Sequence, residues 1–299
     1  MAETICPGLP ASWINAWLAA VGATVLDSRI RLRWTMGRTP AAVLVAAGVD
    51  PVEALAASWP DREMLSELPI AERWRDTPPM PRRIAVEAFQ ARARAARGHP
   101  FSWTLSSTVT DLSLDAKGEV AHAPFDPAGP GTIKWLHHRL LKVHGEVEPS
   151  AGRLTQSLLG TAERITDNGL GFDLTRMGSQ ADGSAMTVDP VVEVLAFFGL
   201  ALLPVRGTGT DASRHRSSYS PAVQRGWVRA RADRRRYRFK WPAWSPALDR
   251  AAIDALLDIW KPDEKRRWDR CGVHAGWQTV QFKPRATADA TRAFGAERI

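Results

Sequence analysis

The most apolar stretch of the chain runs from Pro190 to Val205. It contains Glu193 and is interrupted by Pro204, whereas a membrane-spanning helix needs about 20 consecutive apolar residues. The sequence therefore predicts a helix over 190–203 that is buried inside the protein, and it predicts no membrane segment. At 299 residues, 44% of them hydrophobic, the chain is long enough to build a substantial core as one large domain or two packed ones.

An earlier segment is similar to this apolar helix. Residues 17–26 and 194–203 share a Leu-Ala pair, a glycine three residues after that pair, and a final leucine. Any two buried helices that pack closely through a glycine have this pattern, and an internal duplication would also produce it.

Hydrophobic periodicity and turn residues predict a mixed α+β fold of helices and short antiparallel sheets. Further helices are predicted over 12–22 with Ser12 as the N-cap, and over 41–47, 52–59, 82–97, 132–144 and 246–260. Strands are predicted over 29–35 and within 103–114, and the last sixteen residues are predicted to be frayed. The proline-rich run 77–81 is predicted to be a linker. The chain then divides into regions 1–76, 82–160 and 161–299.

The positive charge of the chain is concentrated in one segment, residues 214–240. The whole chain has a net charge of +8. The segment holds ten lysines and arginines and one acid, Asp233, which gives +9, so the other 272 residues sum to −1. Clustered cations neutralise phosphates and release counterions, which drives binding to nucleic acid. An acidic protein partner, or a solvated charged face without a ligand, is the alternative.

Aromatic residues are interleaved with these cations. Both tyrosines of the chain, Tyr219 and Tyr237, lie in the segment, and aromatic faces can stack on bases. From 236 to 241 cations and aromatics alternate, which on a strand places them on opposite faces. The predicted phosphate contacts are Arg225, Arg229, Arg231, Arg234, Arg235, Arg236, Arg238 and Lys240, with Trp227 and Tyr237 stacking or bracing.

A second basic surface is conceivable on the predicted helix 82–97, where Arg92, Arg94 and Arg97 cluster. The alternative is an amphipathic helix with one wet face, because alanine and arginine are good helix formers.

Residues suited to catalysis are present, but no catalytic motif is. His137 and His144 lie seven residues apart on one predicted helix without a carboxylate at metal-ligand spacing. Four aspartates in the glycine-rich region are typical of turns and caps, although they would allow a two-metal nuclease if they met in space: Asp167, Asp173, Asp182 and Asp189. We therefore expect a binding subunit with no metal and no cofactor, and keep a metal-dependent nuclease as the alternative.

The cysteines and the N-terminus bear on the cellular compartment. Two cysteines, Cys6 and Cys271, exclude a disulfide framework and a four-cysteine zinc site, which favours a reducing, cytoplasmic environment. The first residues lack the basic start and apolar run of a secretory signal.

Residues 169–248 resemble a block found in proteins of type I-G (formerly I-U) CRISPR–Cas systems. The resemblance is carried by residues 169–179 and 188–206, by Gln224-Arg-Gly-Trp227, and by Phe239-Lys-Trp-Pro-Ala-Trp-Ser-Pro-Ala-Leu248. Residues 17–22 are similar to the opening helix of the same group. The resemblance implies a component of an antiviral, RNA-guided complex that contacts DNA, guide RNA, other effector subunits or the helicase–nuclease.

Overall fold

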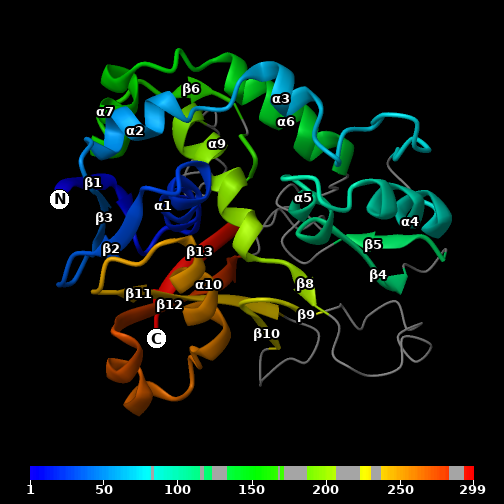
Figure 1. Ribbon diagram of the computed structural model, residues 1–299. Helices are drawn as coiled ribbons and strands as arrows, with labels where there is room; N and C mark the ends of the chain where they lie inside the picture. Colours follow the sequence, from blue (N-terminus) through cyan, green and yellow to red (C-terminus); the bar gives the residue numbers. More distant parts are fainter. Residues whose placement is uncertain are drawn as a thin grey trace.

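Two helices, α1 (Ile14–Leu26) and α9 (Pro190–Gly199), pack against each other near the centre of the molecule (Figure 1). The computed structural model describes residues 1–81, 84–114, 118–122, 133–167, 169–171, 187–206, 223–229, 237–282 and 293–299. Every residue of α9 is buried, as its apolar sequence predicts. Asp189 caps this helix by accepting a hydrogen bond from the backbone N–H of Val191 at 3.0 Å.

The closest approach of α1 and α9 is made by two glycines. A Cβ atom on Gly22 would overlap with the backbone carbonyl of Leu195, and a Cβ atom on Gly199 would overlap with that of Leu18. The contact is reciprocal, because the leucine and the glycine are four residues apart on both helices. This packing is sufficient to account for the pattern that segments 17–26 and 194–203 share.

A three-stranded antiparallel sheet covers one side of α1. Its strands are β1 (Ala2–Pro10), β3 (Ala41–Ala46) and β2 (Arg31–Trp34), in that order across the sheet. The strand predicted over 29–35 is confirmed, and the helix predicted over 41–47 is wrong. Residues 41–46 are a central strand paired with β1 and β2. A short apolar run has no period that distinguishes a buried strand from a helix, and pairing on both edges decides for the strand.

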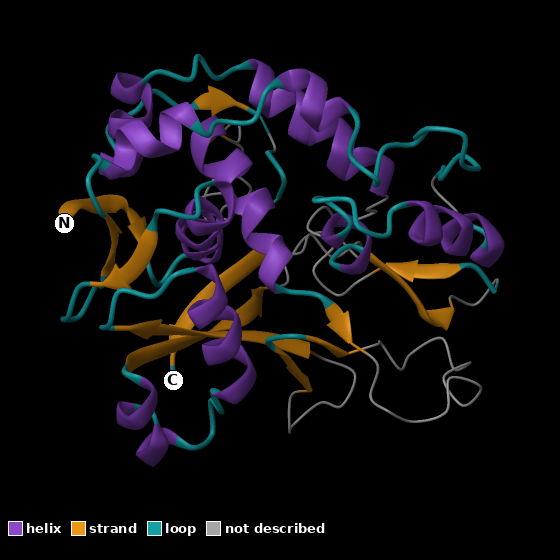
Figure 2. Cartoon of the chain, viewed as in Figure 1, coloured by secondary structure: helices purple, strands orange, loops and turns teal. Residues whose placement is uncertain are grey.

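A second antiparallel sheet packs on α1 through aromatic side chains (Figure 2). Its strands are β10 (Trp227–Arg229), β11 (Tyr237–Trp244), β12 (Val273–Phe282) and β13 (Ala293–Arg298). The indole of Trp17 donates to Pro242 O at 2.9 Å, and that of Trp241 donates to Ala11 O at 2.7 Å. The prediction of frayed ends is wrong for 293–298, which pair with β12.

The remaining elements surround these two sheets. The other helices are α2 (Pro51–Ala57), α3 (Arg62–Ser66), α4 (Val86–Ala95), α5 (Trp103–Ser106), α6 (Ile133–Gly145), α7 (Ala151–Leu159) and α10 (Arg250–Ile259). Short 3-10 turns are η1 (Leu200–Leu202), η3 (Lys265–Arg267) and η4 (Asp269–Cys271). Two-stranded ladders pair β4 (Val109–Leu114) with β5 (Val120–His122), β6 (Ile165–Thr166) with β7 (Thr187–Val188), and β8 (Val205–Arg206) with β9 (Val223–Gln224).

The structure confirms the predicted α+β class. The helices predicted over 52–59, 82–97, 132–144 and 246–260 are present with shifted ends. The helices α3, α5 and α7 were not predicted, and α5 occupies the start of 103–114, where only 109–114 form the expected strand. Ser12 is not the cap of α1, because Trp13 occupies the N-cap position without a side-chain hydrogen bond. One hydrophobic core cluster includes residues from all three regions, 1–76, 82–160 and 161–299.

Candidate nucleic-acid interface

The structure describes two parts of the basic segment. The first is residues 223–229, which form β9, a turn and β10, and the second is residues 237–240 of β11. Arg225, Trp227 and Arg229 belong to the first part, and Tyr237, Arg238 and Lys240 to the second. The side chains of Arg229 and Tyr237 lie outside the described residues. Arg231, Arg234, Arg235 and Arg236 also lie outside the described ranges.

Arg225 is part of the fold and is not exposed to a ligand. Its side chain is 5% exposed and forms ion pairs with Asp254 at 2.5 Å and Asp258 at 2.8 Å, both on α10. The same guanidinium donates to Leu202 O at 2.9 Å. Carboxylates four residues apart share one helix face, so α10 presents both of them to one guanidinium. The prediction that Arg225 contacts phosphate is therefore wrong, because the side chain is buried and two carboxylates and a carbonyl hold its terminal nitrogens.

Trp227 packs into the protein. It is a buried residue of β10, and its ring lies 5.7 Å from that of Phe239 on the neighbouring strand. This position suits the bracing role that the sequence predicts for Trp227, because a ring inside the core is not available to stack on a base.

The alternation along β11 is present where side chains are described. Phe239 and Trp241 are buried in the core, at 1% and 0% exposure, while Arg238 and Lys240 remain partly exposed. Both cations have carboxylate partners: Arg238 pairs with Glu297 at 2.9 Å and Lys240 with Asp263 at 3.1 Å. The Arg238–Glu297 pair is partly exposed and therefore weak, whereas the side chain of Lys240 is only 13% exposed. A polyanion would have to displace a carboxylate at each position.

The strand β10 and the strand β11 form a hairpin whose last described pair is Arg229 with Tyr237. The seven residues that connect them contain four arginines and one acid, Asp233. Two chain positions that are paired in a sheet lie about 5 Å apart, so this connection begins and ends at one place on the protein. The two ends of this arginine-rich connection are therefore fixed by the pairing of β10 with β11.

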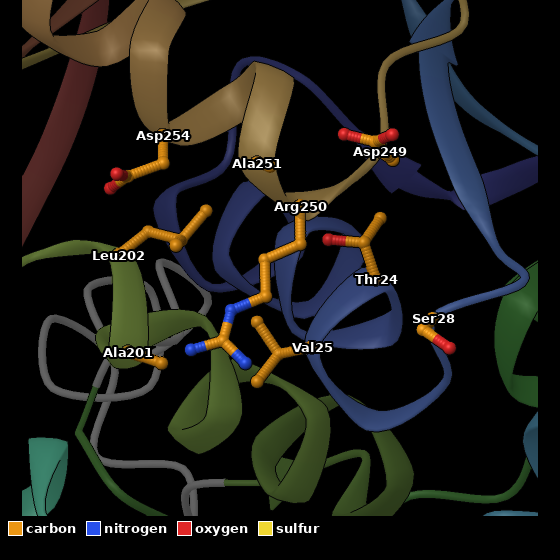
Figure 3. Close-up of a pocket in the computed structure, with 9 residues that line it drawn as sticks. All are labelled: Thr24, Val25, Ser28, Ala201, Leu202, Asp249, Arg250, Ala251 and Asp254. Atoms are coloured by element: carbon orange, nitrogen blue, oxygen red, sulfur yellow. The ribbon is translucent and has the colours of Figure 1, made fainter.

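A pocket of about 600 Å³ adjoins the Arg225 site (Figure 3). It lies where the end of α1, the turn η1 and the start of α10 meet, and Leu202 and Asp254 contribute both to its wall and to the binding of Arg225. Figure 3 shows the side chain of Arg250 extending across the pocket toward Ala201 and Val25. None of the lining residues has a buried side-chain polar atom without a partner, so the pocket contains no group that requires a ligand.

The histidines of α6 have structural partners. His137 Nε2 donates to Leu65 O at 2.8 Å, and His144 Nε2 donates to Pro60 O at 2.7 Å. Both hydrogen bonds link α6 to the segment around α3. Burial lowers the pKa of His137, the hydrogen bond to Leu65 O partly opposes this, and the charge of His138 lowers the pKa further. Among the described residues no group of histidine, cysteine and carboxylate side chains could hold a metal ion.

Two of the four candidate metal-binding aspartates also have structural partners. Asp167 pairs with Lys142 and accepts from the backbone N–H of Gly169 at 2.8 Å. Asp189 caps α9 and accepts from Ser157 Oγ at 3.0 Å, and burial raises its pKa. Asp173 and Asp182 lie outside the described ranges.

The second predicted basic surface is wrong in one member, Arg92. This residue is fully buried, and its guanidinium donates to four backbone carbonyl oxygens: Pro69, Ala71, Glu72 and Pro78. The proline-rich run 77–81 is consequently packed against α4, and Met80 within it is fully buried. Sequence analysis missed this role because an arginine at the end of a polar helix normally lies in solvent.

These features define the class of the protein as an α+β fold carrying a basic hairpin that is anchored by ion pairs to a neighbouring helix. No family model, curated protein or solved structure matches the chain. In the part of the chain that the structure describes, no helix is long and apolar enough to cross a membrane.

Proposed function

We propose that this chain is a non-catalytic nucleic-acid-binding component of a type I-G-like CRISPR–Cas complex in the cytoplasm. The observation that carries the proposal is the hairpin β10–β11, whose paired residues Arg229 and Tyr237 enclose four arginines and a single carboxylate. One acid cannot neutralise four guanidinium groups, so the connection retains a net charge of +3. Planar guanidinium groups suit bidentate contact with phosphate oxygens.

The proposal divides the basic residues into two sets. Arg231, Arg234, Arg235 and Arg236 make the phosphate contacts, whereas Arg225 orients the hairpin by its attachment to α10. The resemblance of residues 169–248 to type I-G proteins supports the assignment to an effector complex. DNA, guide RNA, other effector subunits and the helicase–nuclease are the partners that this assignment implies.

The experiment compares the triple variant Arg234→Ala, Arg235→Ala, Arg236→Ala with a control that removes the same charge elsewhere. Arg38, Arg266 and Arg270 suit the control, because they are exposed and have no ion pair among the described residues. Affinity is measured by fluorescence anisotropy with unrelated DNA and RNA oligonucleotides at several salt concentrations. We expect the hairpin variant to bind all sequences more weakly than the control. The slope of log affinity against log salt should fall by about 2 to 3. Equal affinities of the two variants would refute the proposal.

The same probes test two rival functions. Metal-dependent cleavage that is lost in Asp173→Asn would identify a nuclease. An adaptor that docks on an acidic protein would bind that partner equally well in the presence of excess free oligonucleotide, whereas a nucleic-acid-binding subunit that uses the same arginines would be displaced.

A further inference from the structure

The loop between α3 and α4 contains a strained arginine. Arg75 has a φ of 47°, the only positive φ of a non-glycine residue in the described ranges. A left-handed backbone conformation is unfavourable for a residue with a Cβ atom, so it persists only where the surroundings impose it. In Figure 1 this loop lies together with α4 on the side of the α1–α9 pair that is opposite to the β1–β3–β2 sheet.

Two neighbours impose the conformation of the loop. Trp74 is buried and donates from Nε1 to Glu67 O at 2.7 Å, which fixes its ring. Arg92 holds the loop on both sides of Arg75 through the carbonyls of Ala71, Glu72 and Pro78. The left-handed turn places the guanidinium of Arg75 over the ring of Trp74, 4.6 Å from its centroid. Arg75 as a whole is exposed to solvent.

His99 lies against the same tryptophan ring. The two rings are 5.6 Å apart in an edge-to-face arrangement. The backbone N–H of Phe101 donates to His99 Nδ1 at 3.2 Å, which places the proton of the neutral imidazole on Nε2. Burial lowers the pKa of His99, the charge of Arg75 lowers it further, and the charge of Glu67 partly opposes both. At neutral pH the imidazole is therefore an uncharged hydrogen-bond donor beside a fixed cation.

Arginines outnumber acidic residues in the sequence around this tryptophan. Residues 72–99 contain seven arginines and three acids, a net charge of +4. Arg92 is buried, but four of the others are exposed and form no ion pair with any residue that the structure describes: Arg73, Arg75, Arg94 and Arg97. They differ in this respect from Arg225, Arg238 and Lys240 of the basic segment.

We propose that Arg75 and His99, supported by Arg73 and Arg97, form a second binding site for the phosphate backbone of a nucleic-acid strand. Arg75 is exposed and its guanidinium lies over an indole ring, a position suited to bidentate phosphate contact. His99 Nε2 supplies a neutral donor to an adjacent phosphate oxygen. The choice of nucleic acid over an acidic protein rests on the proposed function. The described cations of this segment that form no ion pair are all arginines, and their planar guanidinium groups suit phosphate.

The test uses the full chain and the variant Arg75→Ala, Arg97→Ala. Its charge-matched control is Arg38→Ala, Arg266→Ala, and the probes are single-stranded DNA and RNA oligonucleotides. We expect about fivefold or greater weakening relative to the control, and a salt slope smaller by about 1.5, for the loss of two phosphate contacts. Affinity equal to that of the control would overturn the inference. So would tighter binding of polyglutamate than of an oligonucleotide of equal charge to the wild-type protein, if the variant lost this preference, since that result would identify an acidic protein as the partner.

A second variant separates binding from folding. Arg75→Gly removes the side chain but accepts the left-handed conformation without strain. We expect an unchanged or higher melting temperature together with weaker binding. A lower melting temperature with unchanged affinity would show that Arg75 is structural and would overturn the inference.

The experiments distinguish failure of the hairpin site from failure of the second site. If the Arg234–Arg236 variant retains the affinity of its control while Arg75→Ala, Arg97→Ala binds weakly, the hairpin proposal falls and the second site stands. The opposite result overturns the second site and leaves the hairpin proposal intact.

Discussion

Gly22 of α1 and Gly199 of α9 face each other where the two central helices come closest. A Cβ atom on Gly22 would lie 2.9 Å from the backbone nitrogen of Gly199 and would also overlap with the carbonyl of Leu195. The missing side chains allow backbone to pack on backbone, and each helix thereby buries its apolar surface against the other. The core of the molecule depends on this contact.

Replacing Gly22 by alanine should destabilise the protein. The new methyl group would push α1 away from α9, and overpacking of this kind costs about 1–3 kcal/mol or more. The free energy of unfolding, measured by chemical denaturation, should fall by that amount. Gly152→Ala on α7 is the control, because a Cβ atom there meets only Ser150 Oγ at 4.0 Å. The control should gain about 0.5–1 kcal/mol from the better helix propensity of alanine. Equal effects of the two substitutions would show that the helices separate without cost.

Arg225 should matter for stability and not for direct contact with nucleic acid. Arg225→Ala removes a buried guanidinium from Leu202 O, Asp254 and Asp258 and should lower the free energy of unfolding by about 1–3 kcal/mol. The two carboxylates are 48% and 40% exposed, so water can solvate them once the arginine is gone. Removing both carboxylates should cost more, about 3–5 kcal/mol, because a buried charge then loses its partners. A folded Arg225→Ala variant whose salt slope falls by a full contact would contradict this assignment.

Arg92 should not tolerate lysine. Its guanidinium satisfies four carbonyls at once, whereas an ammonium group offers three donors in a different geometry. Burial lowers the pKa of Arg92 to about 10, which leaves the group charged at neutral pH. We expect Arg92→Lys to lower the free energy of unfolding by about 2 kcal/mol and to speed hydrogen exchange in the 69–80 loop. The exposed neighbour Arg94→Lys should change neither quantity.

The buried histidine of α6 should make stability depend on pH. Because burial holds the pKa of His137 below its ordinary 6.5, the unfolded chain takes up a proton at a higher pH than the folded protein. The contribution of His137 to stability is therefore complete above pH 6.5 and is lost as the pH falls from 6.5 through the folded pKa. Glutamine places an amide nitrogen near the position of Nε2 and does not titrate.

The difference in unfolding free energy between wild type and His137→Gln, followed from pH 8 to pH 5, isolates this contribution. Other titrating groups, such as Asp27 and Asp189, are common to both proteins, so their contributions to the unfolding free energy cancel in the difference. The wild type should lose more stability than the variant on acidification. Parallel curves would mean that His137 titrates normally in the folded protein.

Local patterns in the sequence were enough to predict a long continuous apolar run and a strand that buries only one face. The apolar run at 190–203 identified α9, and the alternation at 238–241 identified the inward aromatics and the outward cations of β11. They were not enough at Ala41–Ala46, where six small apolar residues fit either a helix or a strand. Pairing with β2, the preceding strand, and with the more distant β1 settled that choice, and a local window over residues 41–46 records neither pairing.

The sequence by itself determined that this chain has a large core with a fully buried helix and that its excess positive charge is confined to 214–240. Both properties depend on residues that are neighbours along the chain, so local composition and the spacing of apolar residues reveal them directly. Only the tertiary structure decided which cations are free. Arg225 meets Asp254 and Asp258, 29 and 33 residues away, and Arg92 meets carbonyls up to 23 residues away. A charged side chain is neutralised by opposite charges and polar groups that lie within a few ångströms of it in the folded protein. The number of residues between two groups along the chain does not determine that distance.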